Sequence, residues 1–178
     1  MNNLIQNYIG FDGRLNRQRF WISGIILAVV SLVISFLLLP LIGVNMMPAL
    51  NPTASNSAEV LAALPDAMRR SGWVSLVLFL VFLYPAASIC IKRRHDRNNN
   101  GLDVWIYFAL AAINLLIQAL GFGLSSTTVN DVTIPTPGPL SLALGAIVAI
   151  YALYLLVVLG FLKGTTGANN YGPDPLQG

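Results

Sequence analysis

The stretch FWISGIILAVVSLVISFLLLPLIG, from Phe20 to Gly43, decides the fold of this chain. It runs for 24 residues without a charged side chain. Because an α-helix rises about 1.5 Å per residue, the stretch can cross the ~30 Å hydrocarbon core of a bilayer with some tilt. It also far exceeds the roughly 7 to 15 apolar residues of a signal peptide, so we predict an uncleaved membrane-spanning helix.

Three further charge-free runs follow, at residues 73–91, 104–124 and 140–162. The whole chain of 178 residues is 56% hydrophobic and 10% charged, whereas soluble domains carry about 25% charged residues. Four apolar segments of spanning length would leave a soluble protein no amphipathic layer to cover them. We therefore predict an all-α polytopic membrane protein, a four-transmembrane-helix bundle that forms one membrane domain over residues 1–178.

Lys and Arg side chains are distributed unevenly between the two sides of these spans. An even number of spans places both termini on one side, and eight of the ten Lys and Arg residues fall there. The opposite side has Arg69 and Arg70. The positive-inside rule then predicts that both termini are cytoplasmic. The eight residues are Arg14, Arg17, Arg19, Lys92, Arg93, Arg94, Arg97 and Lys163.

The two connections on the opposite side are predicted to face outward. In the longer one, residues 44–72, Asn56 followed by Glu59 forms a capping-box pattern. This pattern predicts a short interfacial helix that is interrupted or restarted at Pro65. The shorter connection, between the third and fourth spans, is predicted to be a loop over residues 125–139.

Three polar segments flank the spans on the predicted cytoplasmic side: FDGRLNRQRFW at 11–21, IKRRHDRNNNG at 91–101 and GANNYGPDP at 167–175. Together they resemble the signatures of a bacterial inner-membrane family, domain of unknown function 805. The middle segment departs from the family pattern at Asn100 and Leu102. The resemblance implies a four-helix protein of the bacterial inner membrane and supplies no activity.

The basic side chains of these segments form a candidate motif cluster. Each Lys or Arg near an anionic leaflet contributes about 1 kcal/mol to membrane attraction, so we expect contact with anionic lipid headgroups. The favoured interpretation is that these residues only fix topology; the sharper hypothesis is a headgroup pocket with Asp12 and Asp96 as counter-ions. The cluster comprises Arg14, Arg17, Arg19, Arg93, Arg94, His95, Asp96, Arg97 and Tyr171. Tyr171 is expected to tuck against the helix ends, and a mobile tail is the alternative.

Catalysis and metal binding find little support in the residue inventory. Cys90 and His95 are the sole cysteine and histidine, which leaves too few soft ligands for a transition metal, and we predict no metal and no cofactor. His95 and Asp96 offer an acid or base near neutral pH, but neighbours on a helix point about 100° apart, so catalysis is disfavoured. Nucleic acid is not an expected partner, because the basic clusters adjoin apolar spans.

Inside the membrane, Asn114 and Gln118 lie one turn apart in the third span. Pointing inward, they could bond to Tyr151 or Tyr154 of the fourth span and hold the helices together. The leading hypothesis is a non-enzymatic inner-membrane protein whose motif cluster contacts lipid headgroups or a protein partner, with self-association left open. The alternatives are a small transporter or channel subunit that uses the Asn114 face, and a membrane enzyme acting at His95 and Asp96.

Overall fold

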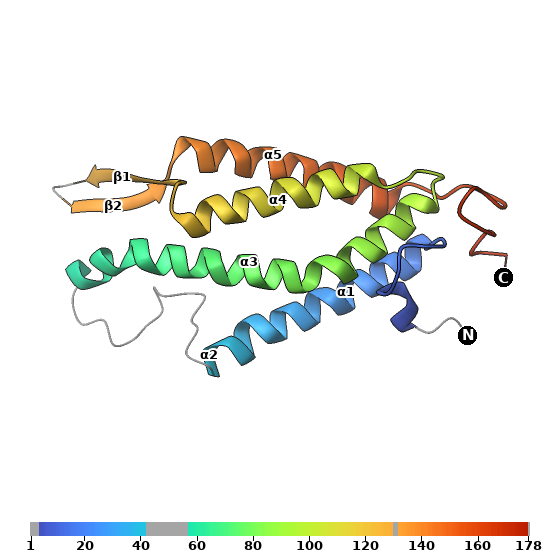
Figure 1. Ribbon diagram of the computed structural model, residues 1–178, viewed down its shortest axis with the longest axis horizontal. Helices are drawn as coiled ribbons and strands as arrows, with labels where there is room; N and C mark the ends of the chain where they lie inside the picture. Colours follow the sequence, from blue (N-terminus) through green and yellow to red (C-terminus); the bar gives the residue numbers. More distant parts are fainter. Residues whose placement is uncertain (1–3, 42–56, 130–131, 178) are drawn as a thin grey trace. The chain divides into compact units, whose positions relative to one another are not determined.

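The computed structural model describes residues 4–41, 57–129 and 132–177. Four helices in these ranges are long and apolar enough to cross a membrane, so the all-α polytopic prediction is confirmed. In chain order they are α1 (Arg17–Val33, continued by a π-helical turn Ile34–Leu38 and by α2, Leu39–Leu41), α3 (Ser57–His95), α4 (Leu102–Leu120) and α5 (Pro139–Leu155, continued by a π-helical turn Leu156–Phe161) (Figure 1). Large apolar side chains such as Leu37, Ile150 and Leu153 are more than half exposed, as a lipid-facing surface requires.

Helix α3 differs from the prediction at both ends. It has 39 residues and passes through Pro65 without a break, so the predicted interruption there is wrong. A proline removes one backbone hydrogen bond, and outside an apolar run water can hydrate the freed carbonyl. Arg69 and Arg70 therefore belong to a helix rather than to a loop. Asn56, the proposed capping residue, lies outside the described residues.

The predicted loop at 125–139 is largely a β-hairpin. Strands β1 (Leu124–Val129) and β2 (Val132–Pro137) pair antiparallel, with Thr128 opposite Thr133 (Figure 1). The hydroxyl oxygens of that pair lie 3.3 Å apart. Threonine and valine favour extended backbone because their branched Cβ packs well on a pleated surface. The third span accordingly ends at Leu120 instead of 124.

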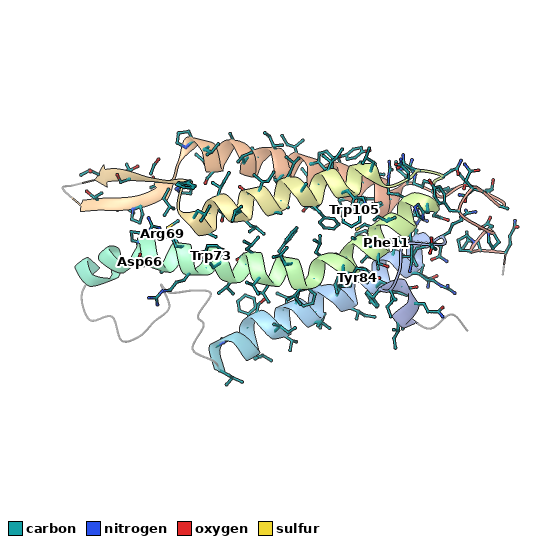
Figure 2. The ribbon with its side chains drawn as sticks, in the orientation of Figure 1. Phe11, Asp66, Arg69, Trp73, Tyr84 and Trp105 are labelled. Atoms are coloured by element: carbon teal, nitrogen blue, oxygen red, sulfur yellow. The ribbon has the colours of Figure 1, made fainter. Side chains whose placement is uncertain are left out.

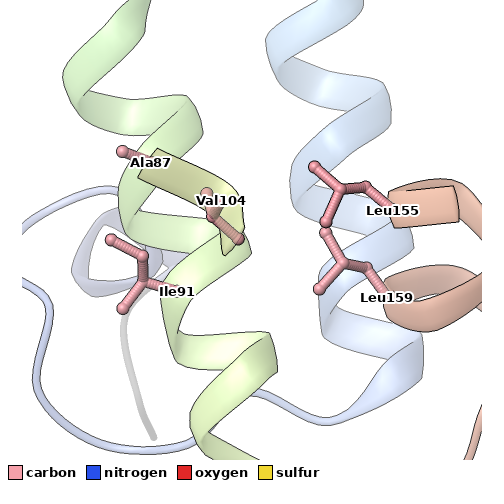
Figure 3. Close-up of a cluster of buried hydrophobic side chains, with 5 residues drawn as sticks. All are labelled: Ala87, Ile91, Val104, Leu155 and Leu159. Atoms are coloured by element: carbon pink, nitrogen blue, oxygen red, sulfur yellow. The ribbon is translucent and has the colours of Figure 1, made fainter. Parts of the chain in front are cut away.

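The described structure divides into two compact units, and the candidate site lies in the first, residues 1–32, 80–109 and 149–178. Its core joins Ala87 and Ile91 of α3, Val104 of α4, and Leu155 and Leu159 near the end of the fourth span (Figure 3). The tight connection from α3 to α4 needs left-handed backbone at Asn98 (φ 56°) and Gly101 (φ 75°).

An aromatic group forms one side of this unit. Phe11 lies between Tyr84 and Trp105, with ring centroids 5.4 Å and 5.7 Å away, both in edge-on geometry (Figure 2). Trp105 is 42% exposed. Partly exposed Trp and Tyr rings are typical of the membrane–water interface, which agrees with this group lying at the end of the apolar spans.

The second unit comprises residues 33–79 and 110–148, and it includes the hairpin. Helices α3 and α4 approach closely there: a Cβ atom on Gly72 would lie 2.8 Å from Cα of Ala119. Small residues permit such backbone proximity between membrane helices. Figure 2 shows Asp66, Arg69 and Trp73 on the α3 segment of this unit.

Candidate functional site

Five consecutive ionisable residues end helix α3 and its following turn, from Lys92 to Asp96, and all five are buried. Their exposed fractions run from 0% at Arg93 to 8% at His95. Charged side chains are rarely this buried unless they are paired. The site is therefore defined by the partners that other segments bring to these five side chains.

The carboxylate of Asp96 is held by two arginines from different segments. Arg14 donates from Nε and Nη2 to Oδ1, at 3.2 Å and 3.1 Å, and Arg93 donates from Nη1 to Oδ2. The Arg14 and Arg93 side chains are only 2% and 1% exposed. This triad, Arg14–Asp96–Arg93, joins the first and second sequence motifs, and charge-assisted bonds of this kind are among the stronger ones in proteins.

Arg14 also binds the third motif. Its Nη1 donates to the carbonyl oxygen of Gly167 and its Nη2 to that of Thr165, both at 2.6 Å. The backbone N–H of Thr165 in turn donates to the Asp96 carbonyl at 2.8 Å. The three polar segments that sequence analysis singled out therefore meet at one place, and both chain ends lie on the same side of this unit (Figure 1).

The end of the fourth span is capped mainly by side chains, beside a backbone bond from the Leu162 N–H to the Val157 carbonyl at 3.3 Å. The last carbonyls of a helix have no intrahelical donors and carry partial negative charge, so they attract cations. Five consecutive carbonyls, residues 158–162, accept such bonds. The donors are Arg97 to Val158 (3.4 Å), Arg93 to Leu159 (2.8 Å) and Leu162 (2.5 Å), Trp21 to Gly160 (3.0 Å) and Arg17 to Phe161 (3.2 Å).

His95 is engaged by the tail of the chain. The Tyr171 ring stacks on its imidazole with 3.8 Å between centroids and 8° between planes. Its Nδ1 lies 3.2 Å from the Gly13 carbonyl, and Asn169 donates from Nδ2 to the His95 carbonyl at 2.9 Å. Both oxygens of the neighbouring Asp96 carboxylate are bound by guanidinium groups, so Asp96 does not orient the His95 imidazole.

Arg94 forms a second ion pair that sequence analysis missed. Its Nη2 lies 2.9 Å from Asp103 Oδ2, and its Nε donates to Oδ1 at 3.1 Å. Tyr154 donates its hydroxyl to the same carboxylate at 3.2 Å. An acidic residue in the first turn of a helix is favourable by itself, and this position of Asp103 after Gly101 was the available signal.

The basic residues thus fall into two sets. Arg14, Lys92, Arg93 and Arg94 are committed to internal partners. The second set, which we call the outer cations, is Arg17, Arg19, Arg97 and Lys163: Arg17 and Lys163 are exposed, and Arg19 and Arg97 are half-buried. Arg17 and Arg97 each make one long bond to a helix-end carbonyl, so most of their donors stay available.

The polar residues expected inside the membrane differ in burial and in neighbours. Asn114 Oδ1 is buried without a hydrogen-bond partner among the described residues, and Gln118 is exposed. Tyr151 stacks on Tyr107 at 6.0 Å between centroids, and Tyr154 donates to the Asp103 carboxylate. Within the described ranges no group of three or more His, Cys, Asp or Glu could hold a metal ion.

Four membrane-crossing helices with a polar site at their ends define a multi-pass membrane protein. The three polar motifs, residues 11–21, 91–101 and 167–175, join at that site, which we call the cap. The family model described as "Protein of unknown function (DUF805)" matches residues 8–173, and the chain belongs to that family. It is similar to "Inner membrane protein YhaI" of Escherichia coli strain K12 and to its counterpart in strain O157:H7. Each is 22% identical over 175 residues, which cover 98% of this chain and 93% of the relative. No solved structure matches significantly.

Proposed function

We propose that this chain is a non-enzymatic protein of the bacterial inner membrane, with both termini in the cytoplasm, whose outer cations hold anionic lipid headgroups. The observation that carries the proposal is the division of the basic residues. The buried set stabilises the cap, whereas Arg17, Arg19, Arg97 and Lys163 remain at the ends of the spans with donors to spare. Cations at that level attract anionic headgroups by about 1 kcal/mol each.

The location and the orientation rest on separate arguments. The matched relatives are named inner membrane proteins. Both chain ends share one side of the site-bearing unit, and eight of the ten Lys and Arg residues belong to that side by sequence. The positive-inside rule makes it the cytoplasmic side. A reporter fused to the C-terminus that is active in the cytoplasm would support this orientation, and one active only outside would overturn it.

The lipid contact is tested by measuring which lipids copurify. In the outer-cation variant, the four residues Arg17, Arg19, Arg97 and Lys163 are replaced by Gln. Native mass spectrometry from mild detergent should show that phosphatidylglycerol and cardiolipin adducts of the wild type are lost in this variant. The matched control is R69Q/R70Q, because both arginines are exposed on α3 in the other unit. Equal amounts of anionic lipid on all three proteins would refute headgroup binding. If the wild type carries a bound protein that the outer-cation variant lacks, the outer cations bind a protein partner.

A small transporter or channel subunit is the second candidate, and it rests on Asn114. A buried amide oxygen without a partner is unfavourable by about 1–3 kcal/mol, and such an atom can mark a binding position inside a span. Conductance across planar bilayers that changes in N114L would favour this function. A silent wild type together with a more stable N114L would indicate that the amide serves neither transport nor packing.

A further inference from the structure

The segment before the first span folds back against the spans. Residues Leu4–Asn7 form a 3₁₀ helix. From this segment Asn7 donates its Nδ2 to the hydroxyl oxygen of Ser23 at 2.9 Å, and both residues are buried. The Tyr8 hydroxyl donates to the Ser23 carbonyl at 3.0 Å. The chain before α1 is therefore bound to α1 itself.

The backbone of this segment is also satisfied by side chains of α3. Ser88 Oγ donates to the carbonyls of residues 7 and 10, at 2.9 Å and 2.5 Å. Lys92 Nζ donates to the carbonyls of residues 6 and 9, at 2.5 Å and 2.8 Å. The Gly10 N–H donates to the Tyr84 hydroxyl at 3.0 Å. Non-helical backbone is tolerated at membrane depth only when its polar groups are paired in this way.

Two of the contact residues, Ser23 and Ser88, lie deeper along their helices than the arginines Arg17 and Arg93. Ser23 lies six residues beyond Arg17 in α1, and Ser88 lies five residues before Arg93 in α3. At about 1.5 Å per helical residue, these offsets are roughly 7 to 9 Å towards the apolar part of each helix. The groups of the segment that bond to these serines therefore lie below the level of Arg17 and Arg93, and the Lys92 ammonium group reaches the same segment from beside Arg93.

The exposed side of the segment is mainly apolar, with Gln6 as the exposed polar side chain among residues 4–10. Leu4, Ile5 and Ile9 are 51%, 65% and 60% exposed, while the polar side chain of Asn7 is 7% exposed. A segment in the cytosol would bury its apolar side chains and expose its polar ones. Apart from Gln6, the segment has the reverse arrangement, which is that of a surface solvated by lipid and continues the exposed apolar surface of the spans.

We propose that residues 4–10 are inserted into the inner part of the bilayer beside α1 and α3, with Leu4, Ile5 and Ile9 in contact with lipid acyl chains. The segment is then a re-entrant element that seals the polar bonds to Ser23 and Ser88 from lipid. It brings Phe11 against Tyr84. This inference does not depend on headgroup binding by the outer cations.

The proposal is tested by the depth of spin labels in reconstituted vesicles. Nitroxides are attached to I5C and to I9C, each in a C90A background, in vesicles of phosphatidylethanolamine and phosphatidylglycerol. The control is L176C, because Leu176 is an apolar residue that is 77% exposed in the tail. Collisions with oxygen should exceed collisions with a water-soluble nickel chelate several-fold at residues 5 and 9, and the order should reverse at residue 176.

Water-like accessibility at both labelled isoleucines, equal to that at residue 176, would overturn the proposal. The thermal unfolding midpoint of each labelled protein is first compared with that of the wild type. If one label perturbs folding, the result from the other label is used. Should both labels perturb folding, cross-linking of a photoreactive amino acid at residue 5 to lipid decides. Lipid adducts support insertion, and adducts to a water-soluble scavenger alone contradict it.

Discussion

Replacing Asp96 by Asn tests whether the Arg14–Asp96–Arg93 triad stabilises the cap. The change keeps the shape of the side chain and removes its charge, so two guanidinium groups that are 2% and 1% exposed lose their counter-ion. Breaking a buried ion pair by neutralising one partner costs about 3–5 kcal/mol, mainly because the remaining charge is left uncompensated. Because two guanidinium groups lose one counter-ion, we expect D96N to lower the free energy of unfolding by about 4 kcal/mol.

The loss is measured as a shift of the thermal unfolding midpoint in lipid nanodiscs, followed by tryptophan fluorescence. For a chain of this length, 1 kcal/mol corresponds to about 2–4 °C, so D96N should melt roughly 8 to 16 °C below the wild type. The control is D12N, since Asp12 is an exposed carboxylate. Its midpoint should shift by less than about 2 °C, as expected for a surface substitution.

Comparison with R14Q separates coupling from simple loss of contacts. If Arg14 and Asp96 interact directly, the double variant should be more stable than the sum of the single losses predicts, by about 0.5–3 kcal/mol. Additive losses would mean that each side chain acts alone. A D96N midpoint within 2 °C of the wild type would refute the argument that these buried charges depend on one carboxylate.

Three further changes have defined outcomes. G160A should lower the unfolding free energy by about 1–3 kcal/mol, because the new Cβ would lie 2.7 Å from the Trp21 ring, whereas G145A, with no neighbour within 4 Å, should be neutral in the same melting assay. Y171A removes the ring stacked on the histidine and should lose about 0.5–1.5 kcal/mol together with protease resistance of the tail, while Y171F should retain both. Two backbone N–H bonds lower the pKa of Asp174 below its ordinary value, so its contribution to tail order is present above about pH 3.9 and is lost as pH falls through the lower folded value. Tail proteolysis should therefore increase on acidification in the wild type, and D174N should lack this pH dependence.

The spans were predictable because their length and apolar composition can be read directly from the sequence. The run at 20–43 needs no partner to be recognised, since lipid is its solvent. The hairpin at 124–137 was missed because its six polar Ser and Thr residues also fit a loop, and only pairing across the turn distinguishes the two. The passage of α3 through Pro65 was missed for a related reason, because helix continuity depends on hydration and packing as well as on propensity.

The meeting of the three motifs was indicated by their common side, but the burial of the middle motif was not. Successive helical residues point about 100° apart, so a run from Lys92 to Asp96 presents charge in all directions and reads as a solvated helix end. The structure buries every direction because different segments cover them: residues 6–15 lie on one side and the tail on another. Which segment covers which direction is a property of tertiary packing.

The burial of four of the basic residues separates two roles, fixing the orientation of the chain in the membrane and contacting headgroups. Orientation is decided during insertion, when the chain is unfolded and all eight basic residues on one side count against two on the other. The proposed headgroup contact depends on the folded protein, in which the four outer cations remain exposed or half-buried. Neutralising those four leaves Arg14, Lys92, Arg93 and Arg94 against Arg69 and Arg70, which still favours the same orientation. The outer-cation variant should therefore lose anionic lipid without inverting, and a C-terminal reporter that stays on the wild-type side in that variant would show that lipid loss reflects the headgroup contacts alone.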